Sequence, residues 1–137
     1  MAESSNEGRW WQWMLLPIAV VVAATLVAAL GAGIYLLVFD LACPSTDRLD
    51  SACYSGGFLL LERGSFLVVA GLTGLAAIWA GFRVAPSGKF LAAQWLALLL
   101  SLVAILMCLA LDWGMWPIYG SFVVGTLLAL WLLRKRA

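Results

Sequence analysis

The residues best placed for chemistry are two cysteines, Cys43 and Cys53, with nine residues between them in a polar segment. Long apolar runs flank this segment on both sides. On the oxidising side of a membrane, such a pair most naturally forms a structural disulfide. Closing so short a loop contributes roughly 2–3 kcal/mol to stability in the chain-entropy model. We therefore expect a Cys43–Cys53 disulfide that acts as a structural staple.

A redox function is an alternative use of these thiols. The chain has four long apolar runs and two cysteines in a loop between them. In these two features it resembles the disulfide-bond-forming and vitamin K epoxide reductase families, which depend on a Cys-x-x-Cys pair. The sequence contains no Cys-x-x-Cys, and Cys108 stands alone in a later apolar run. A membrane thiol-redox or lipid-modifying enzyme stays the second alternative, and it would need Cys43, Cys53 or the neighbouring charged pair Glu62–Arg63.

Charged residues near the cysteines are candidates for contact with another protein. Asp47 and Asp50 lie in the polar segment, and Glu62 and Arg63 lie at the edge of the next apolar run. An EF-hand calcium loop needs ligands at fixed positions around a central glycine, and these aspartates do not have that spacing. The loop is therefore expected to be solvated and able to attract a basic patch. Glu62 and Arg63 can reach the membrane interface or pair with charges on another subunit.

Composition excludes several classes of function. The chain has no histidine, which rules out a histidine general base, a histidine-ligated haem and a histidine-based metal site. The net charge of +1 argues against nucleic acid as a partner, because phosphate binding needs a concentrated basic face. We expect no cofactor and no metal, although a bound lipid is compatible with the sequence.

Polar side chains within the apolar runs are few. The candidates inside a bilayer are Gln94, Ser101, Cys108 and Thr126. A proton or ion path usually needs carboxylates or paired dipoles near the midplane, and these residues do not provide such a chain. A small oligomeric transporter or channel is nevertheless the first alternative, with a lumen that would include Gln94, Ser101 or Thr126.

Apolar runs must hold these residues in place. With 65% hydrophobic and 11% charged residues and a mean hydropathy of +1.04, the runs need lipid rather than a soluble core. The sequence predicts an all-α integral membrane protein: a four-transmembrane-helix antiparallel bundle, in a single membrane domain over residues 1–137. The expected spans cover about residues 14–39, 58–82 (with 65–82 as the best-placed part), 90–111 and 116–133. Residues 40–57 form the external loop.

Basic residues orient the spans, because cytoplasmic loops carry an excess of lysine and arginine. Six of the eight basic residues lie on the side expected to hold both termini and the 83–89 turn: Arg9, Arg83, Lys89, Arg134, Lys135 and Arg136. Both termini are therefore expected in the cytoplasm. The lack of a transit peptide and of an N-glycosylation sequon favours a bacterial inner membrane.

Small residues recur along every expected span and allow helices to approach closely. The first span has two such lines, Ala24, Ala28 and Ala32 on one and Ala29 and Gly33 on the other. Such lines can serve only to hold the four helices together; alternatively, one line faces outward and receives a helix of another protein, and the first span is the best candidate for this. The leading hypothesis is a non-enzymatic accessory subunit of a membrane complex, or an immunity-type protein that blocks a toxin acting on the same membrane.

Overall fold

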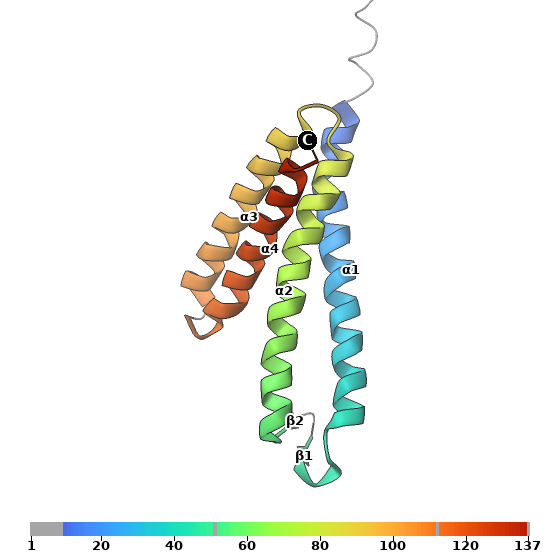
Figure 1. Ribbon diagram of the computed structural model, residues 1–137, viewed down its shortest axis with the longest axis vertical. Coiled ribbons are helices and arrows are strands. Elements are labelled where there is room, and N and C mark those ends of the chain that lie inside the picture. Colours follow the sequence, from blue (N-terminus) through green and yellow to red (C-terminus); the bar gives the residue numbers. More distant parts are fainter. Residues whose placement is uncertain (1–9, 51, 112, 137) are drawn as a thin grey trace, which may run out of the picture.

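The computed structural model describes residues 10–50, 52–111 and 113–136, and over these the chain is almost entirely helical (Figure 1). Its helices are α1 (Trp10–Ala42), α2 (Gly56–Val84), α3 (Lys89–Leu111) and α4 (Trp116–Arg134). All four are long and apolar enough to cross a membrane. The expectation of an all-α chain with four membrane-length helices is confirmed, and each expected span lies within one helix.

Helix ends follow the local sequence. Pro17 lies near the start of α1, and α2 continues through Glu62 and Arg63 without a break. The turn between α2 and α3 contains Pro86 and Gly88, and the backbone φ of Gly88 is +57°. A side chain rarely adopts that left-handed conformation, so glycine suits this turn. The first residue of α4 is followed by Pro117, whose missing N–H costs little at a helix start.

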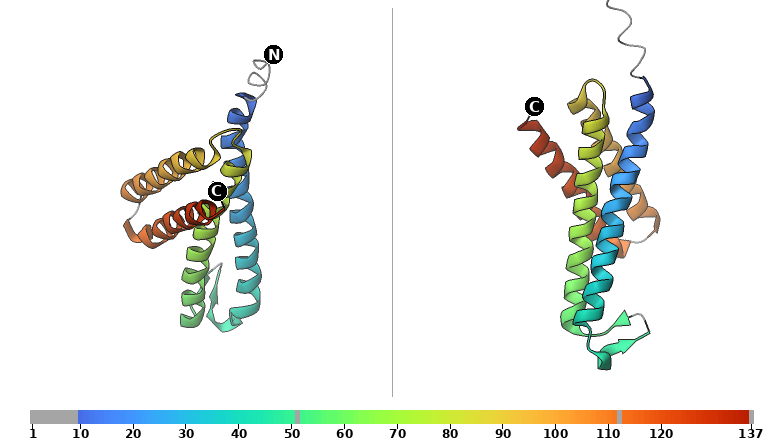
Figure 2. Two further views of the ribbon diagram at one scale, coloured as in Figure 1. Left: turned by 45° about the horizontal axis from the view of Figure 1, so that its top comes forward. Right: turned by 90° about the vertical axis from the view of Figure 1, so that its right-hand side faces the viewer.

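The helix α2 lies at the centre of the molecule (Figures 1 and 2). It packs along α1 on one side and along α4 on another, and α3 packs against α4 and α2. By contrast, α1 makes at most marginal contact with α3 and α4. The molecule therefore consists of two antiparallel hairpins, α1–α2 and α3–α4, joined through α2, and the second leans away from the first (Figure 2).

Small residues allow α2 and α4 to cross with their backbones in contact. A Cβ at Gly125 would collide with the backbone of Gly71, and a Cβ at Gly74 would lie 2.5 Å from the carbonyl oxygen of Phe122. The hydroxyl of Ser121 donates a hydrogen bond of 2.6 Å to the carbonyl of Leu67 in the same contact. The buried core beside this crossing is formed by Ile78, Ala93, Ala97, Ala129 and Leu133.

The two hairpins differ in length. At about 1.5 Å per residue, α1 and α2 are roughly 50 and 44 Å long, whereas α3 and α4 are roughly 35 and 29 Å long. One end of the molecule, called here the terminal end, holds the start of α1 and the end of α4; the opposite, disulfide end holds the loop between α1 and α2 (Figure 1). At the disulfide end the first hairpin projects beyond the α3–α4 turn (Figure 1).

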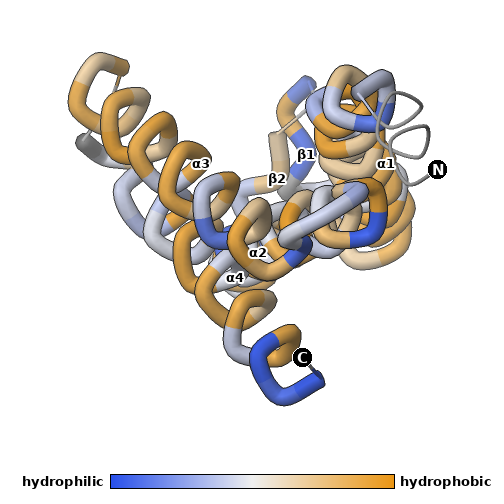
Figure 3. Tube along the Cα trace, turned by 90° about the horizontal axis from the view of Figure 1, so that it is seen from above, coloured by the Kyte–Doolittle hydropathy of each residue, from blue (hydrophilic) through white to orange (hydrophobic). Residues whose placement is uncertain are grey.

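The helices consist mainly of hydrophobic residues (Figure 3). Large apolar side chains are exposed on every helix, for example Leu30 at 67%, Leu60 at 74% and Trp95 at 65%. A water-soluble chain of this size rarely exposes so much contiguous apolar surface. The surface therefore suits a lipid environment.

Candidate functional site

The structure pairs the two loop cysteines. Their sulfurs are 1.98 Å apart and their Cα atoms 6.0 Å apart, which fits the predicted disulfide. A two-residue antiparallel ladder, β1 (Arg48–Leu49) with β2 (Ala52–Cys53), places Arg48 opposite Cys53. Cys43 and Cys53 are buried beside Phe58 at the start of α2. The disulfide therefore ties the end of α1 to the beginning of α2.

Aromatic rings lie between α1 and α2 next to the disulfide. This aromatic cluster consists of Tyr35, Phe39, Phe58 and Phe66. Phe39 and Phe58 meet edge to face at 5.5 Å between centroids, and Tyr35 lies 6.1 Å from Phe58 and 5.7 Å from Phe66. Such pairs add about 0.5–1.5 kcal/mol each beyond their buried area. The cluster therefore packs α1 against α2 next to the disulfide.

The two charges of the Glu62–Arg63 pair point to different partners. The hydroxyl of Tyr35 donates a hydrogen bond of 2.9 Å to Oε1 of Glu62, so that carboxylate is held by α1. Arg63 is exposed and lies at a cavity of about 440 Å³ shared with Gly114, Met115 and other residues of the α3–α4 turn. Arg63 therefore stands level with that turn, and of the two charges it is the more accessible to another molecule.

Arg48 fixes the loop to the end of α1. Its guanidinium donates hydrogen bonds of 3.1 Å to the carbonyl of Phe39 and 2.8 Å to the carbonyl of Asp40. It also stacks 5.1 Å over the Phe39 ring and lies 3.7 Å from the carboxylate of Asp40. The last carbonyls of a helix lack partners within it, and a cation there satisfies them and complements the helix dipole.

Sequence reasoning did not single out Tyr35 or Arg48. A basic residue a few positions past the expected end of a helix is a weak signal for Arg48, because such residues often bind the last carbonyls. Nothing local indicates that Tyr35 faces Glu62, since the two residues are 27 positions apart. Their pairing depends on the register of α1 against α2.

Of the two acidic candidates in the loop, Asp47 and Asp50, the structure describes only the side chain of Asp50. Asp50 is exposed at the hairpin turn, with φ of +50°, a conformation that aspartate tolerates better than most residues. Asp47 ends the short 3-10 turn η2 (Ser45–Asp47), and its side chain lies outside the described part of the structure. Asp50 is therefore placed where a partner could reach it.

The small residues of α1 lie mainly on its uncovered side. Ala24 is half-buried, whereas Ala28, Ala29, Ala32 and Gly33 are exposed. A Cβ at Gly33 would meet nothing within 4 Å, whereas one at Gly31 would lie 2.6 Å from the Val69 side chain of α2. Gly31, which sequence reasoning did not single out, is therefore the glycine that lets α1 approach α2.

The polar intramembrane candidates do not form one group. Ser101 of α3 and Thr126 of α4 lie together, with their hydroxyl oxygens 3.5 Å apart, and Thr126 is fully buried and donates a 2.7 Å bond to the Val123 carbonyl. Gln94 is exposed, and Cys108 is half-buried with a free thiol. Each stands seven positions from Ser101 along α3, which is about 10 Å. Ser101 and Thr126 thus form an internal pair rather than part of a polar path.

The described residues contain no group of three or more histidines, cysteines or carboxylates that could hold a metal ion. The sequence matches no protein-family model, and no characterised protein or solved structure is significantly similar to it. The exposed surfaces and cavities of the chain are therefore the features that bear on its function.

Proposed function

We propose that this chain is a non-enzymatic membrane protein whose outer α1 face receives a transmembrane helix of another protein. In this role it is an accessory subunit of a membrane complex, or an immunity-type protein that blocks a toxin acting on the same membrane. The proposal includes four spans, both termini in the cytoplasm and location in a bacterial inner membrane.

The contrast between α1 and the other helices carries the proposal. Small residues of α2, α3 and α4 are buried inside the molecule, among them Gly74, Ala77, Ala93, Ala97, Gly125 and Ala129. Most of the corresponding small residues of α1 are exposed, and only 6% of its most apolar stretch is buried, against 11% for α3 and 22% for α2 and α4. Because lipid tails are as apolar as leucine, small residues on an exposed face favour close helix contact rather than lipid solvation.

The charges at the two ends support the proposed orientation. Five basic residues lie at the terminal end: Arg83, Lys89, Arg134, Lys135 and Arg136. The disulfide lies at the opposite end, and disulfides persist in oxidising compartments. Both features agree with a terminal end in the cytoplasm and a disulfide end outside it.

Site-specific crosslinking in native membranes tests the proposal. A photoreactive side chain at Ala29 or Gly33 should form a crosslink to one defined protein, whereas one at exposed Leu98 of α3 should not. Mass spectrometry of the adduct identifies the partner. Gly33→Leu should then reduce copurification of that partner, and Ala110→Leu, at another exposed small residue, should leave it unchanged.

Three outcomes separate the possibilities. Crosslinks to a second copy of the chain would point to a homo-oligomer and reopen the transporter or channel alternative. Crosslinks to lipid alone, together with purification as a monomer, would contradict the partner-binding proposal. A single heterologous partner lost in Gly33→Leu and kept in Ala110→Leu would support it.

A further inference from the structure

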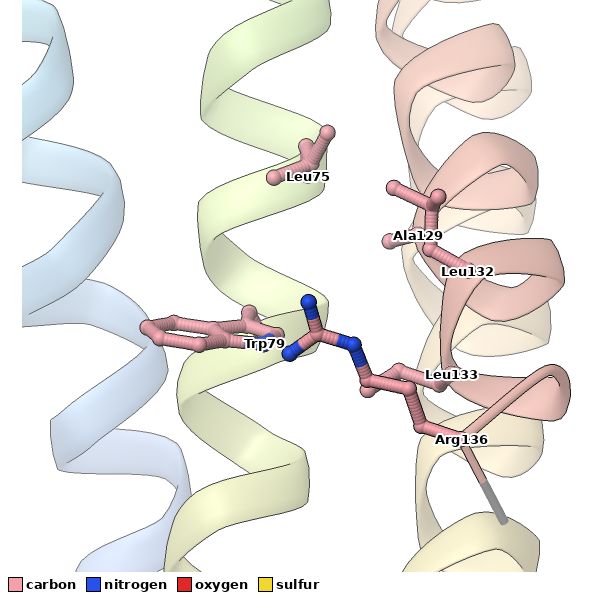
Figure 4. Close-up of a pocket in the computed structure, with 6 residues that line it drawn as sticks. All are labelled: Leu75, Trp79, Ala129, Leu132, Leu133 and Arg136. Carbon is pink, nitrogen blue, oxygen red and sulfur yellow. The ribbon is translucent and has the colours of Figure 1, made fainter.

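A cavity of about 320 Å³ opens between α2 and α4 at the terminal end (Figure 4). It is lined by Leu75, Trp79, Ala129, Leu132, Leu133 and Arg136. Ala129 and Leu133 are each only 2% exposed and belong to the packed core, so this wall is firmly held. The cavity combines an apolar wall with an indole and a guanidinium.

Two guanidinium groups come close to the same indole. Arg83, one turn along α2, stacks 4.7 Å over the Trp79 ring. Figure 4 shows the side chain of Arg136 reaching from the end of α4 towards Trp79. Stacking leaves the planar donor edge of Arg83 free and limits its rotation. Arg136 thus lines the cavity from beyond the end of α4, while Arg83 is held by α2 against the indole that forms part of the cavity wall.

The described part of the chain offers no counter-charge at this end. Its described carboxylate side chains, those of Asp40, Asp50 and Glu62, belong to the disulfide end of α1, the loop and α2. The ion pair of Arg48 with Asp40 also lies there. Arg83 and Arg136 thus have no carboxylate partner among residues 10–50, 52–111 and 113–136. An anion bound there would complete the arrangement.

We propose that this cavity binds an anionic phospholipid of the leaflet at the terminal end. The phosphate lies between Arg83 and Arg136, which can each donate two parallel hydrogen bonds to its oxygens. An acyl chain follows the apolar wall past Leu132 and Leu75. The cavity lies at a suitable depth for a lipid headgroup. Tryptophans prefer the headgroup layer, and Trp79 lies one turn deeper than Arg83. The proposal depends on membrane insertion but not on a protein partner.

The charge balance favours an anionic over a zwitterionic lipid. A choline headgroup would bring its own cation into a region that already holds Arg83 and Arg136 and three further basic residues. Basic pockets between membrane helices on the cytoplasmic side are known to suit acidic headgroups. Phosphatidylglycerol is therefore expected to bind more tightly than phosphatidylcholine.

Native mass spectrometry of the full-length protein, titrated with each lipid in detergent, tests the site. The wild type should bind phosphatidylglycerol about tenfold more tightly than phosphatidylcholine, and Arg83→Gln with Arg136→Gln should abolish most of this preference. The matched control is Arg134→Gln with Lys135→Gln. It removes the same charge at the same end, but Arg134 lines a different cavity and Lys135 stacks on Trp131. The control should keep the preference within about threefold of wild type.

Several results would overturn the proposal. If both double variants lost the preference for phosphatidylglycerol equally, the preference would come from general charge attraction and not from this cavity. Equal binding of both lipids by the wild type would remove the basis for an anionic site. A delipidated protein that instead holds an acidic protein segment at Arg83 and Arg136 would assign the cavity to a different occupant. Helical circular dichroism of every variant shows that lost binding is not lost folding.

Discussion

The hydroxyl of Tyr35 donates a hydrogen bond of 2.9 Å to Glu62, linking α1 to α2 close to the disulfide loop. Tyr35 also belongs to the aromatic cluster, stacking against Phe66 at 5.7 Å. A hydrogen bond to a carboxylate is stronger than one between neutral groups, especially beside apolar side chains. This bond links the two helices in their observed register and gives a charged residue of a mainly apolar hairpin a hydrogen-bond partner.

Replacing Tyr35 by phenylalanine keeps the ring and removes the donor. We expect a loss of stability of about 1.5 kcal/mol, near the lower limit for hydrogen bonds to charged groups, because Glu62 is only partly buried. Unfolding in mixed micelles measures the loss. Tyr54→Phe is the control, since Tyr54 is 65% exposed, and its effect should be near zero. Equal effects of the two substitutions would show that the bond does not stabilise the fold.

Removing the disulfide should destabilise the α1–α2 hairpin. The double variant Cys43→Ala with Cys53→Ala should lose roughly 2–3 kcal/mol, because closing the loop no longer restricts the unfolded chain. Addition of a reductant should lower the Tm of the wild type and leave that of the double variant unchanged. Cys108→Ala keeps the disulfide and should respond to reductant like the wild type. A wild type insensitive to reductant would contradict the prediction.

The loop should depend on the hydrogen bonds of Arg48 rather than on its ion pair. Asp40 is 73% exposed, and exposed ion pairs contribute about 0–1 kcal/mol, so Asp40→Asn should change little. Arg48→Ala leaves two carbonyls at the end of α1 without their donor. Amide hydrogen exchange over residues 40–50 should rise in Arg48→Ala and stay near wild type in Asp40→Asn. The opposite ranking would assign the effect to the ion pair.

The crossing of α2 and α4 should be intolerant of added atoms. A Cβ at Gly125 would collide with the backbone of Gly71, and backbone cannot move aside as a flexible side chain can. We expect Gly125→Ala to cost about 1–3 kcal/mol or more through overpacking. Gly120→Ala lies on the same helix with nothing within 4 Å, and it should be neutral or slightly stabilising. Unfolding of both variants in mixed micelles compares them directly.

Thiol labelling of intact cells tests the orientation. In a background whose three native cysteines are replaced by alanine, Ser45→Cys places a thiol in the loop and Ser87→Cys one in the α2–α3 turn. A membrane-impermeant reagent should label Ser45→Cys in intact cells and Ser87→Cys only after the cells are opened. Labelling of Ser87→Cys alone in intact cells would reverse the proposed orientation.

The length and composition of the apolar runs were sufficient to predict four membrane-length helices. A run of about 20 apolar residues has few alternatives to a helix of this kind, since a bilayer leaves no partner for unpaired backbone groups. The disulfide could be predicted equally well, because two thiols in one short loop can meet whatever the arrangement of the rest of the fold. The sequence also predicted that small residues along every span allow helices to approach closely, and several of those in α2, α3 and α4 are buried.

Contacts between distant residues could not be predicted in the same way. The bond between Tyr35 and Glu62 and the fit of Gly31 against Val69 depend on the register and rotation of two helices. Periodicity fixes which residues share a face of one helix but not which face meets a given neighbour. For the same reason, the approach of Arg136 to Trp79 joins residues more than fifty positions apart and leaves no local signal.

The unequal length of the two hairpins gives the molecule a built-in spacer. Arg63 stands level with the α3–α4 turn, so residues 56–62 of α2 rise about 10 Å beyond it. If the shorter hairpin spans a hydrocarbon core of about 30 Å, the disulfide loop lies near the outer edge of the headgroup layer. The fold alone therefore sets the distance between the disulfide loop and the α3–α4 turn.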